Sequence, residues 1–131
     1  MFQTQKVFLL ILVLLALSAS LAMADSPCAH LTLGLNPTSV ARGGNVKATA
    51  SVQNCSNEFE KFAIHFSGKG PCDWVVSLGN VYMGFTIGST RTATLSFTVP
   101  QEACTGTATV TARVYYKGAL ITSSKTTLLV Q

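Results

Sequence analysis

The sequence predicts an all-β fold, an antiparallel β-sandwich of seven to eight strands that follows a signal peptide. Apolar and polar residues alternate with period two through most of residues 31–130, as they do in strands that bury one face and expose the other. Gly, Pro and Asn interrupt this alternation at regular intervals, which is typical of the turns in a sandwich. A stretch of about 100 residues is the usual size of one such domain.

The first 24 residues have the pattern of an export signal. Lys6 supplies a positive charge, residues 7–17 are apolar, and a small-x-small cleavage pattern ends at Ala24. Removing 24 of the 131 residues would leave 107. We therefore expect a single domain over residues 25–131 that is secreted, periplasmic or at the cell surface. Retention of the segment as an anchor is the alternative, but the apolar run is short for a span of about 20 residues. We expect no membrane span after cleavage.

The first half of the domain contains four predicted strands. Leucines alternate along the first strand, and the turn around Pro37 ends it. Gly43 and Gly44 form the next turn, before a strand in which valines and alanines alternate with polar residues. Phenylalanines and an isoleucine alternate along the third strand, and Trp74 opens the fourth. These strands cover residues 31–35, 46–53, 61–66 and 74–78.

The second half of the domain contains four more predicted strands. We expect Gly79 and Asn80 to separate the fourth strand from a fifth, which carries apolar residues at every second position up to Ile87. Pro100 ends the sixth strand because it has no N–H to donate to a neighbouring strand. A tight hairpin at Lys117-Gly118 joins the last two. These strands cover residues 81–87, 92–99, 106–114 and 120–130.

Four cysteines follow the signal, and four cysteines allow three pairings. The strand map selects one of them. If the first strand runs upward, Cys28 precedes it at the bottom, and Cys55 ends the downward second strand at the same end. Cys72 follows the upward third strand, and Cys104 follows the 92–99 strand, which should pair antiparallel to the second. We therefore predict disulfides Cys28–Cys55 and Cys72–Cys104 as clasps at the two ends, formed in an oxidising compartment.

The predicted domain carries a modest positive charge. Of the nine Lys and Arg residues eight follow the signal, against five Asp and Glu residues. The positive residues are scattered along the sequence, and no basic run is interleaved with aromatic residues. A weak attraction to acidic surfaces or glycans is compatible with this charge, whereas we do not expect nucleic-acid binding.

Candidate catalytic and metal-ligating residues are few. His65 is predicted on the outward face of its strand, and His30 lies beside the first cysteine. Met83 is the one methionine after the signal and no Cys-x-His-x-Met loop is present, so a copper site is not expected. Glu58 and Glu60 have the residue type of paired acids for glycoside hydrolysis, but a solvated charged edge is the preferred interpretation. We expect no catalytic residue, no bound metal and no cofactor.

Three aromatic residues are candidate ligand-binding residues. Trp74 either packs against a disulfide in the core or lies exposed and stacks on a sugar ring, and the core is the preferred interpretation. Tyr82 and Tyr115 are the other candidates, because Tyr115 and Tyr116 are adjacent and must point to opposite faces of a sheet. Asn54 opens an N-x-S glycosylation pattern whose central cysteine is predicted in a disulfide, so we expect no glycan there.

Several segments share turn and core positions with one group of known domains: Pro37-Thr38-Ser39-Val40, Gly43-Gly44-Asn45, Val52-Gln53-Asn54, Gly88-Ser89-Thr90-Arg91, Phe97-Thr98-Val99-Pro100 and Gly106-Thr107-Ala108-Thr109-Val110. In these segments, and over most of residues 31–130, the chain resembles the bacterial immunoglobulin-like domains of the cell-adhesion-related, or CARDB, type. The resemblance implies an immunoglobulin-like sandwich that acts as a spacer, an adhesin or an accessory module. A single domain with two predicted disulfides departs from the spacer role.

We expect an exported, non-catalytic binding or adhesion module whose partner is a protein or a cell surface. The alternative is a carbohydrate-binding module that uses exposed aromatic residues, and a secreted enzyme is the less favoured alternative. The sequence identifies no particular ligand.

Overall fold

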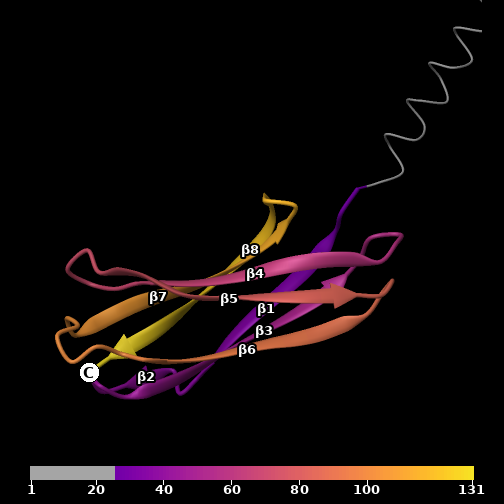
Figure 1. Ribbon diagram of the computed structural model, residues 1–131. Helices are drawn as coiled ribbons and strands as arrows, with labels where there is room; N and C mark the ends of the chain where they lie inside the picture. Colours follow the sequence, from indigo (N-terminus) through magenta and orange to yellow (C-terminus); the bar gives the residue numbers. More distant parts are fainter. Residues whose placement is uncertain (1–25) are drawn as a thin grey trace, which may run out of the picture.

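A computed structural model describes residues 26–131 of the protein (Figure 1). The predicted signal peptide, residues 1–24, lies outside the described residues. Residues 26–131 form strands and turns without a helix, so no helix in this part of the chain is able to cross a membrane. In chain order the strands are β1 (Ala29–Asn36), β2 (Ser39–Val40), β3 (Asn45–Asn54), β4 (Glu60–Lys69), β5 (Val75–Phe85), β6 (Thr90–Thr98), β7 (Gly106–Tyr116) and β8 (Ala119–Val130).

The strands form two sheets that pack face to face. One sheet has the order β1-β3-β6 and the other has the order β2-β8-β7-β4-β5. Neighbouring strands are antiparallel, except that the short β2 runs parallel to β8. The sandwich is elongated, and the C-terminus lies at one end of it (Figure 1). The prediction of an all-β sandwich of seven to eight strands is confirmed.

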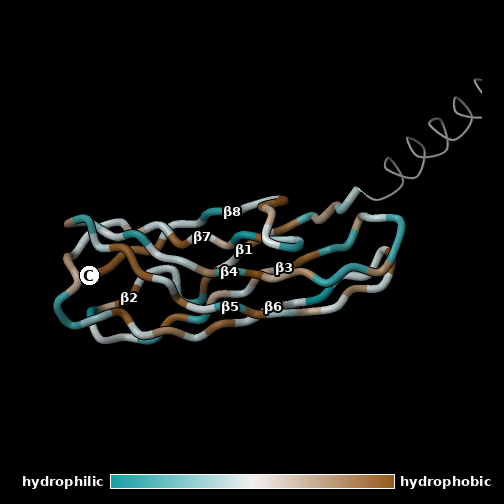
Figure 2. Tube along the Cα trace, turned by 45° about the horizontal axis from the view of Figure 1, so that its top comes forward, coloured by the Kyte–Doolittle hydropathy of each residue, from teal (hydrophilic) through white to brown (hydrophobic). Residues whose placement is uncertain are grey.

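The core between the sheets follows from the alternation in the sequence. Residues that point inward lose their contact with water, and those between them face solvent, because successive side chains of a strand point to opposite faces. Figure 2 shows this as brown apolar residues alternating with white and teal ones. Seven apolar inward residues of β3 and β4 are each at most 1% exposed: Val46, Ala48, Ala50, Val52, Phe62, Ile64 and Phe66.

The predicted fourth and fifth strands are one strand, β5, so the expected break between Leu78 and Val81 is wrong. Gly79 has a φ of 144°, and the pairing of β4 with β5 shifts register between Phe66 and Ser67. These are the features of a β-bulge. The bulge lets Leu78 and Val81, which are three positions apart, both pack against the core. The eighth strand is the two-residue β2, which the sequence does not predict.

Two side chains point the opposite way from the one expected. Ile87, predicted inward, is 65% exposed because β5 ends at Phe85 and Ile87 lies in the following turn. Glu60, predicted on a solvated edge, is only 3% exposed because β4 begins there and alternation points it inward with Phe62. Its Oε1 has no hydrogen-bond partner among the described residues. Glu58, in the loop before β4, is exposed as expected.

Both predicted disulfides are present, one at each end of the sandwich. Cys28 joins Cys55 where β1 and β3 pair, with Cα atoms 4.9 Å apart. Cys72 joins Cys104 across the loops that precede β5 and β7, with Cα atoms 6.2 Å apart. The described residues include no free cysteine. Two structural disulfides in so small a domain are typical of an oxidising compartment.

Candidate functional site

Strand register brings two of the three candidate aromatic residues together on the outer face of the five-stranded sheet. Ala63 of β4 pairs with Tyr82 of β5 on one side and with Tyr115 of β7 on the other. Cross-strand partners share a face of the sheet, so a small side chain separates two tyrosines in one row. Two strand spacings of about 4.8 Å put the tyrosine Cα atoms roughly 9.6 Å apart. The row is therefore a slot with a tyrosine on each side.

This slot is the middle of a groove that runs along β4. On one side of the row, a hollow of about 500 Å³ is lined by both tyrosines together with Lys61 and Lys117. On the other side, a hollow of about 430 Å³ is lined by the same tyrosines together with His65 and Asn80. Both hollows are open to solvent, as is usual for a groove on the outer surface of a sheet. We call the two hollows and the slot between them the tyrosine groove.

The two tyrosines differ in exposure. Tyr82 is 77% exposed on β5, an edge strand, whereas Tyr115 is half-buried on β7, which has a neighbour on each side. The adjacent Tyr116 packs edge-on against Phe62 of the core, with ring centroids 6.4 Å apart. The prediction that Tyr115 and Tyr116 point to opposite faces is therefore confirmed. The half-buried Tyr115 side chain is therefore held by its neighbours, whereas the exposed Tyr82 side chain has room to change its rotamer.

Polar side chains at one end of the groove bond to one another. His65 Nδ1 is hydrogen-bonded to Oδ1 of Asn80, its cross-strand partner on β5. Arg113, the partner of His65 on β7, donates from Nη1 to Ser67 Oγ at 2.9 Å. His65 faces outward, which agrees with the orientation predicted for it. Because these bonds connect neighbouring strands, they hold the polar groups in place before any ligand arrives.

The face that carries the tyrosine groove is basic, although the same charges are scattered in the sequence. None of the outward-facing strand residues on this face is acidic: Glu60 points into the core, and the other three acidic residues of the described chain are in loops, Glu58 and Asp73 at the two ends of β4. We call this outer surface of β4, β5, β7 and β8 the basic face. Five of the eight Lys and Arg residues after the signal lie on it or at its rim: Lys61, Lys69, Arg113, Lys117 and Lys125.

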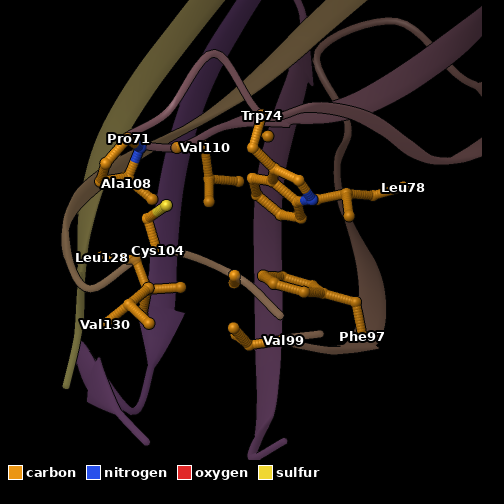
Figure 3. A pocket seen from close by; sticks show the side chains of 13 residues that line it. Pro71, Trp74, Leu78, Phe97, Val99, Cys104, Ala108, Val110, Leu128 and Val130 are labelled. Carbon is orange, nitrogen blue, oxygen red and sulfur yellow. The ribbon is translucent and has the colours of Figure 1, made fainter. Parts of the chain in front are cut away.

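Trp74, the third candidate aromatic residue, directly precedes β5, at the end of the strand away from Tyr82, and points inward. It is half-buried and lines a space of about 10 Å³ among apolar side chains. Figure 3 shows its ring beside Leu78 and facing the ring of Phe97. A Cβ atom on Gly70 would approach Trp74 Cε3 to 2.9 Å, so the ring lies directly against the backbone there. Trp74 and Tyr82 are eight positions apart, about 26 Å along a strand, and the structure does not bring Trp74 into the groove.

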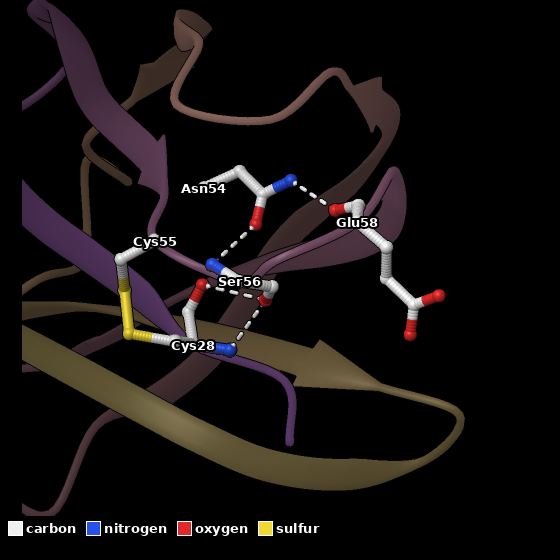
Figure 4. Close-up of a disulfide and its surroundings, with 5 residues drawn as sticks. All are labelled: Cys28, Asn54, Cys55, Ser56 and Glu58. Atoms are coloured by element: carbon white, nitrogen blue, oxygen red, sulfur yellow. Dashed lines mark hydrogen bonds between the residues drawn. A yellow bond between two sulfur atoms is a disulfide. The ribbon is translucent and has the colours of Figure 1, made fainter. Parts of the chain in front are cut away.

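The glycosylation pattern at Asn54 is buried. The Asn54 side chain is fully buried, and its Nδ2 donates to three backbone carbonyl oxygens at 2.9 to 3.3 Å, that of Glu58 among them. Its Oδ1 accepts a hydrogen bond from the backbone N–H of Ser56 at 2.9 Å. The Ser56 hydroxyl in turn bonds to the backbone of Cys28 (Figure 4). The amide is used within the fold, which agrees with the expectation of no glycan at this residue.

One group of metal-ligating residues occurs within residues 26–131, and a disulfide already uses it. The ligand atoms of Cys28, His30 and Cys55 lie within 4.8 Å of one another, but both sulfur atoms belong to the disulfide. Metals bind thiolates, so the three residues do not fit a metal ion while the bridge is intact. His30 is exposed and lies beside this bridge.

The sequence points to Tyr82 and Tyr115 but not to Lys61, Ala63 or Lys117, which complete the groove. Alternation along β4 does place Lys61 and Ala63 on one outward face. What the local pattern lacks is the identity of the neighbouring strands, because β7 follows β4 only after two intervening strands. The row of Tyr82, Ala63 and Tyr115 exists only once the sheet order is known.

The fold and the groove together define the class of the protein. It is an immunoglobulin-like β-sandwich, clasped by a disulfide at each end, with a basic groove between two tyrosines on one outer face.

Comparison with solved structures identifies the type of sandwich. The CARDB domain of PF1109 from Pyrococcus furiosus, solved in complex with di-metal ions, is similar with a TM-score of 0.65 at 11% identity. The match covers 82% of this chain and 90% of that domain. The chain therefore has the CARDB fold, and the predicted resemblance is confirmed. No protein-family model and no curated protein matches the sequence.

The same fold occurs within larger proteins. A β-glucosidase from Erythrobacter marinus has a TM-score of 0.67 at 8% identity, and the match covers 80% of this chain and 16% of the enzyme. The sporulation control protein Spo0M from Bacillus subtilis has a TM-score of 0.60 at 13% identity, with 79% and 49% covered. The chain thus spans a small part of the glucosidase and about half of Spo0M. At these identities the likeness is one of fold.

Proposed function

We propose that the protein is a non-catalytic binding module of the adhesion type, which contacts a cell-surface partner through the tyrosine groove. The observation that carries the proposal is the groove itself, in which Tyr82 and Tyr115 stand on either side of Ala63. Tyr82 is a large aromatic side chain that remains 77% exposed. Exposed tyrosines on a rigid support are typical of contact surfaces, because their rings bury much area at a small entropic cost.

The chemistry of the groove favours binding over catalysis. Its polar groups are tyrosine hydroxyls, the ammonium groups of Lys61 and Lys117, and the His65 imidazole with its Asn80 partner. Glycoside hydrolysis commonly uses two carboxyl groups on either side of the scissile bond, and none of the residues that line the groove is acidic. Stacking and ion pairing need only the groups that line the groove.

A location outside the cytoplasm is supported by two independent features. The residues before Asp25 have the pattern of an export signal, and two disulfides clasp a domain that contains no free cysteine in its described part. The cell-adhesion association of the CARDB type points the same way. We therefore place the protein in the periplasm, at the cell surface or in the medium.

Binding to whole cells tests the proposal. The purified protein is incubated with intact cells and envelope preparations of the organism that encodes it, and bound protein is quantified by fluorescence. We expect a Tyr82→Ala/Tyr115→Ala variant to bind about thirtyfold more weakly, since contact tyrosines often contribute about 1 kcal/mol or more each.

The matched control for this test lies on the outer face of the other sheet. Thr92 and Thr94 are exposed on β6, and a Thr92→Ala/Thr94→Ala variant is expected to bind like the unaltered protein. Equal binding by the two double variants would exclude the tyrosine groove as the contact surface. Chemical turnover of envelope material by the purified protein would contradict a non-catalytic role.

A further inference from the structure

We propose that the tyrosine groove binds an acidic polysaccharide, holding a sugar ring between Tyr82 and Tyr115 and pairing the acidic groups of the polymer with the basic face. This inference rests on the proposed function and names the partner class for the same groove. Two properties of the face carry it, the separation of the tyrosine walls and the sign of the charge around them.

The separation of the walls fits a ring held on both faces. A ring in van der Waals contact with two tyrosine rings needs roughly 7–8 Å between them, because each contact distance is about 3.5–4.0 Å. The two strand spacings between Tyr82 and Tyr115 amount to roughly 9.6 Å. This spacing of the backbones is large enough to admit a sugar ring between the two side chains. Ala63 leaves the floor of the slot open because its side chain is a single methyl group.

The slot opens into a hollow on each side along β4, so it has room for more than one sugar ring. Gly118, in the β7–β8 hairpin, lines both hollows without a side chain. Gly84, the cross-strand partner of Lys61, lies directly against the ring of Phe59, which is 53% exposed and borders the groove at this end. The second hollow continues past the tyrosines as far as His65 and Asn80. From Lys61 to His65 the groove follows β4 for about 13 Å. A chain of several sugar rings, rather than one isolated ring, fits this elongated shape.

The charge along the groove selects an acidic polymer over a neutral one. Lys61 and Lys117 line the hollow on one side of the slot, and Arg113 lies beside His65 on the other. Lys69 and Lys125 extend the basic face along β4 and β8. Lys61 and Lys69 are about 26 Å apart along their strand, and no acidic side chain lies between them on this face. Such a field attracts polyanions and weakens with added salt.

Matched polymers test the selectivity. Binding of the purified protein is measured by biolayer interferometry on polygalacturonate, on the same polymer after full methyl esterification, on alginate and on dextran sulfate. We expect at least one acidic polymer to bind about tenfold more tightly than the esterified, neutral polymer, with an affinity that falls as sodium chloride is raised. Single-stranded DNA is measured as an acidic polymer with flat rings, and it is expected to bind more weakly.

Variants separate the contribution of the groove from net charge. Lys61→Ala/Lys117→Ala is expected to weaken binding about tenfold, whereas Arg42→Ala/Lys47→Ala, which removes the same charge away from the groove, changes it less than about twofold. Tyr82→Ala is expected to weaken binding at least about fivefold, and Tyr82→Phe, which keeps the ring, to retain it. Thermal melting of each variant checks that the sandwich is intact, and the Phe variant supplies the comparison if the Ala variant unfolds.

Each contrary outcome has a distinct meaning. Equal losses in the two lysine and arginine double variants would show binding by net charge and overturn the proposal, as would tighter binding of single-stranded DNA or equal binding of the esterified polymer. If no acidic polymer binds while envelope binding still depends on Tyr82 and Tyr115, the acidic polysaccharide is wrong and the binding function stands. If envelope binding is also independent of these tyrosines, both proposals fail.

Discussion

The two ends of the sandwich carry similar disulfides, but the side chains around the disulfide are polar and hydrogen-bonded at one end and apolar at the other. At the Cys28–Cys55 end, the buried amide of Asn54 and the hydroxyl of Ser56 tie the backbone together by hydrogen bonds (Figure 4). At the Cys72–Cys104 end, Trp74 packs among apolar side chains around a small cavity (Figure 3). A cross-link limits only the unfolded chain in the entropic account. What surrounds it decides how the folded end is held.

The polar end and the apolar end should differ in how much stability they lose on substitution. Hydrogen bonds to a buried amide are directional, and each group left without a partner costs about 1–3 kcal/mol. An apolar contact is non-directional, so its loss scales with the area and cavity left behind. The polar end should therefore respond sharply to a small change, and the apolar end should respond in proportion to volume. Four sets of variants test this contrast.

Removal of the disulfides is expected to have the largest effect. The bridges have sequence separations of 27 and 32, and the chain-entropy estimate gives about 3.5 kcal/mol for each loop. Cys28→Ala/Cys55→Ala and Cys72→Ala/Cys104→Ala should therefore lower the free energy of unfolding by similar amounts in urea titrations. A difference greater than about 1.5 kcal/mol would show that the surroundings, rather than loop length, decide the value of each bridge.

Asn54→Ala is expected to cost about 3 kcal/mol, because it leaves buried carbonyl oxygens and the Ser56 N–H without partners. Gln53→Ala is the neighbouring control. Gln53 is exposed on the same strand, and its truncation should change the free energy of unfolding by less than about 0.5 kcal/mol. Similar urea midpoints for the two variants would remove the distinction between a polar and an apolar end.

Trp74→Ala is expected to cost about 2 kcal/mol, somewhat less than the 3–5 kcal/mol typical of a fully buried aromatic residue, since Trp74 is half-buried. Tyr82→Ala removes an aromatic ring of β5 that is 77% exposed, and it should cost less than about 1 kcal/mol. Thermal denaturation followed by circular dichroism measures both. A larger loss for Tyr82→Ala than for Trp74→Ala would exclude a structural role for the tryptophan ring at its end of the sandwich.

Gly70→Ala is expected to have the smallest effect, about 1 kcal/mol of destabilisation, because the new methyl group would meet the Trp74 ring. The cost should disappear when the same change is made in a Trp74→Ala background, where the ring is gone. Gly34→Ala, whose methyl group would meet nothing within 4 Å, is the control and should be near neutral. An unchanged cost in the double variant would place its origin in the backbone rather than in the ring contact.

Local pattern predicts much of the fold and little of the site. The faces of β3 and β4 follow from alternation, and the cysteine pairing follows from strand direction, because both depend on neighbouring positions in the chain. The same reasoning fails at Gly79, where a bulge replaces the expected break and lets Leu78 and Val81 face the same side. It also fails at Glu60, where the strand begins earlier than expected. Both failures arise because the bulges and the ends of a strand depend on its pairing with a neighbouring strand.

The sequence by itself determined an all-β sandwich, its buried faces and which cysteines meet, since period-two alternation and turn residues act over a few positions. Only the tertiary structure decided that Tyr82 and Tyr115 lie on either side of Ala63, and that five scattered basic residues share one face. The physical reason is the order of strands in the five-stranded sheet. β4 and β5 are consecutive strands, but β7 becomes the other neighbour of β4 through hydrogen bonds between strands that are separated in the chain by β5 and β6, and no local pattern specifies that partner.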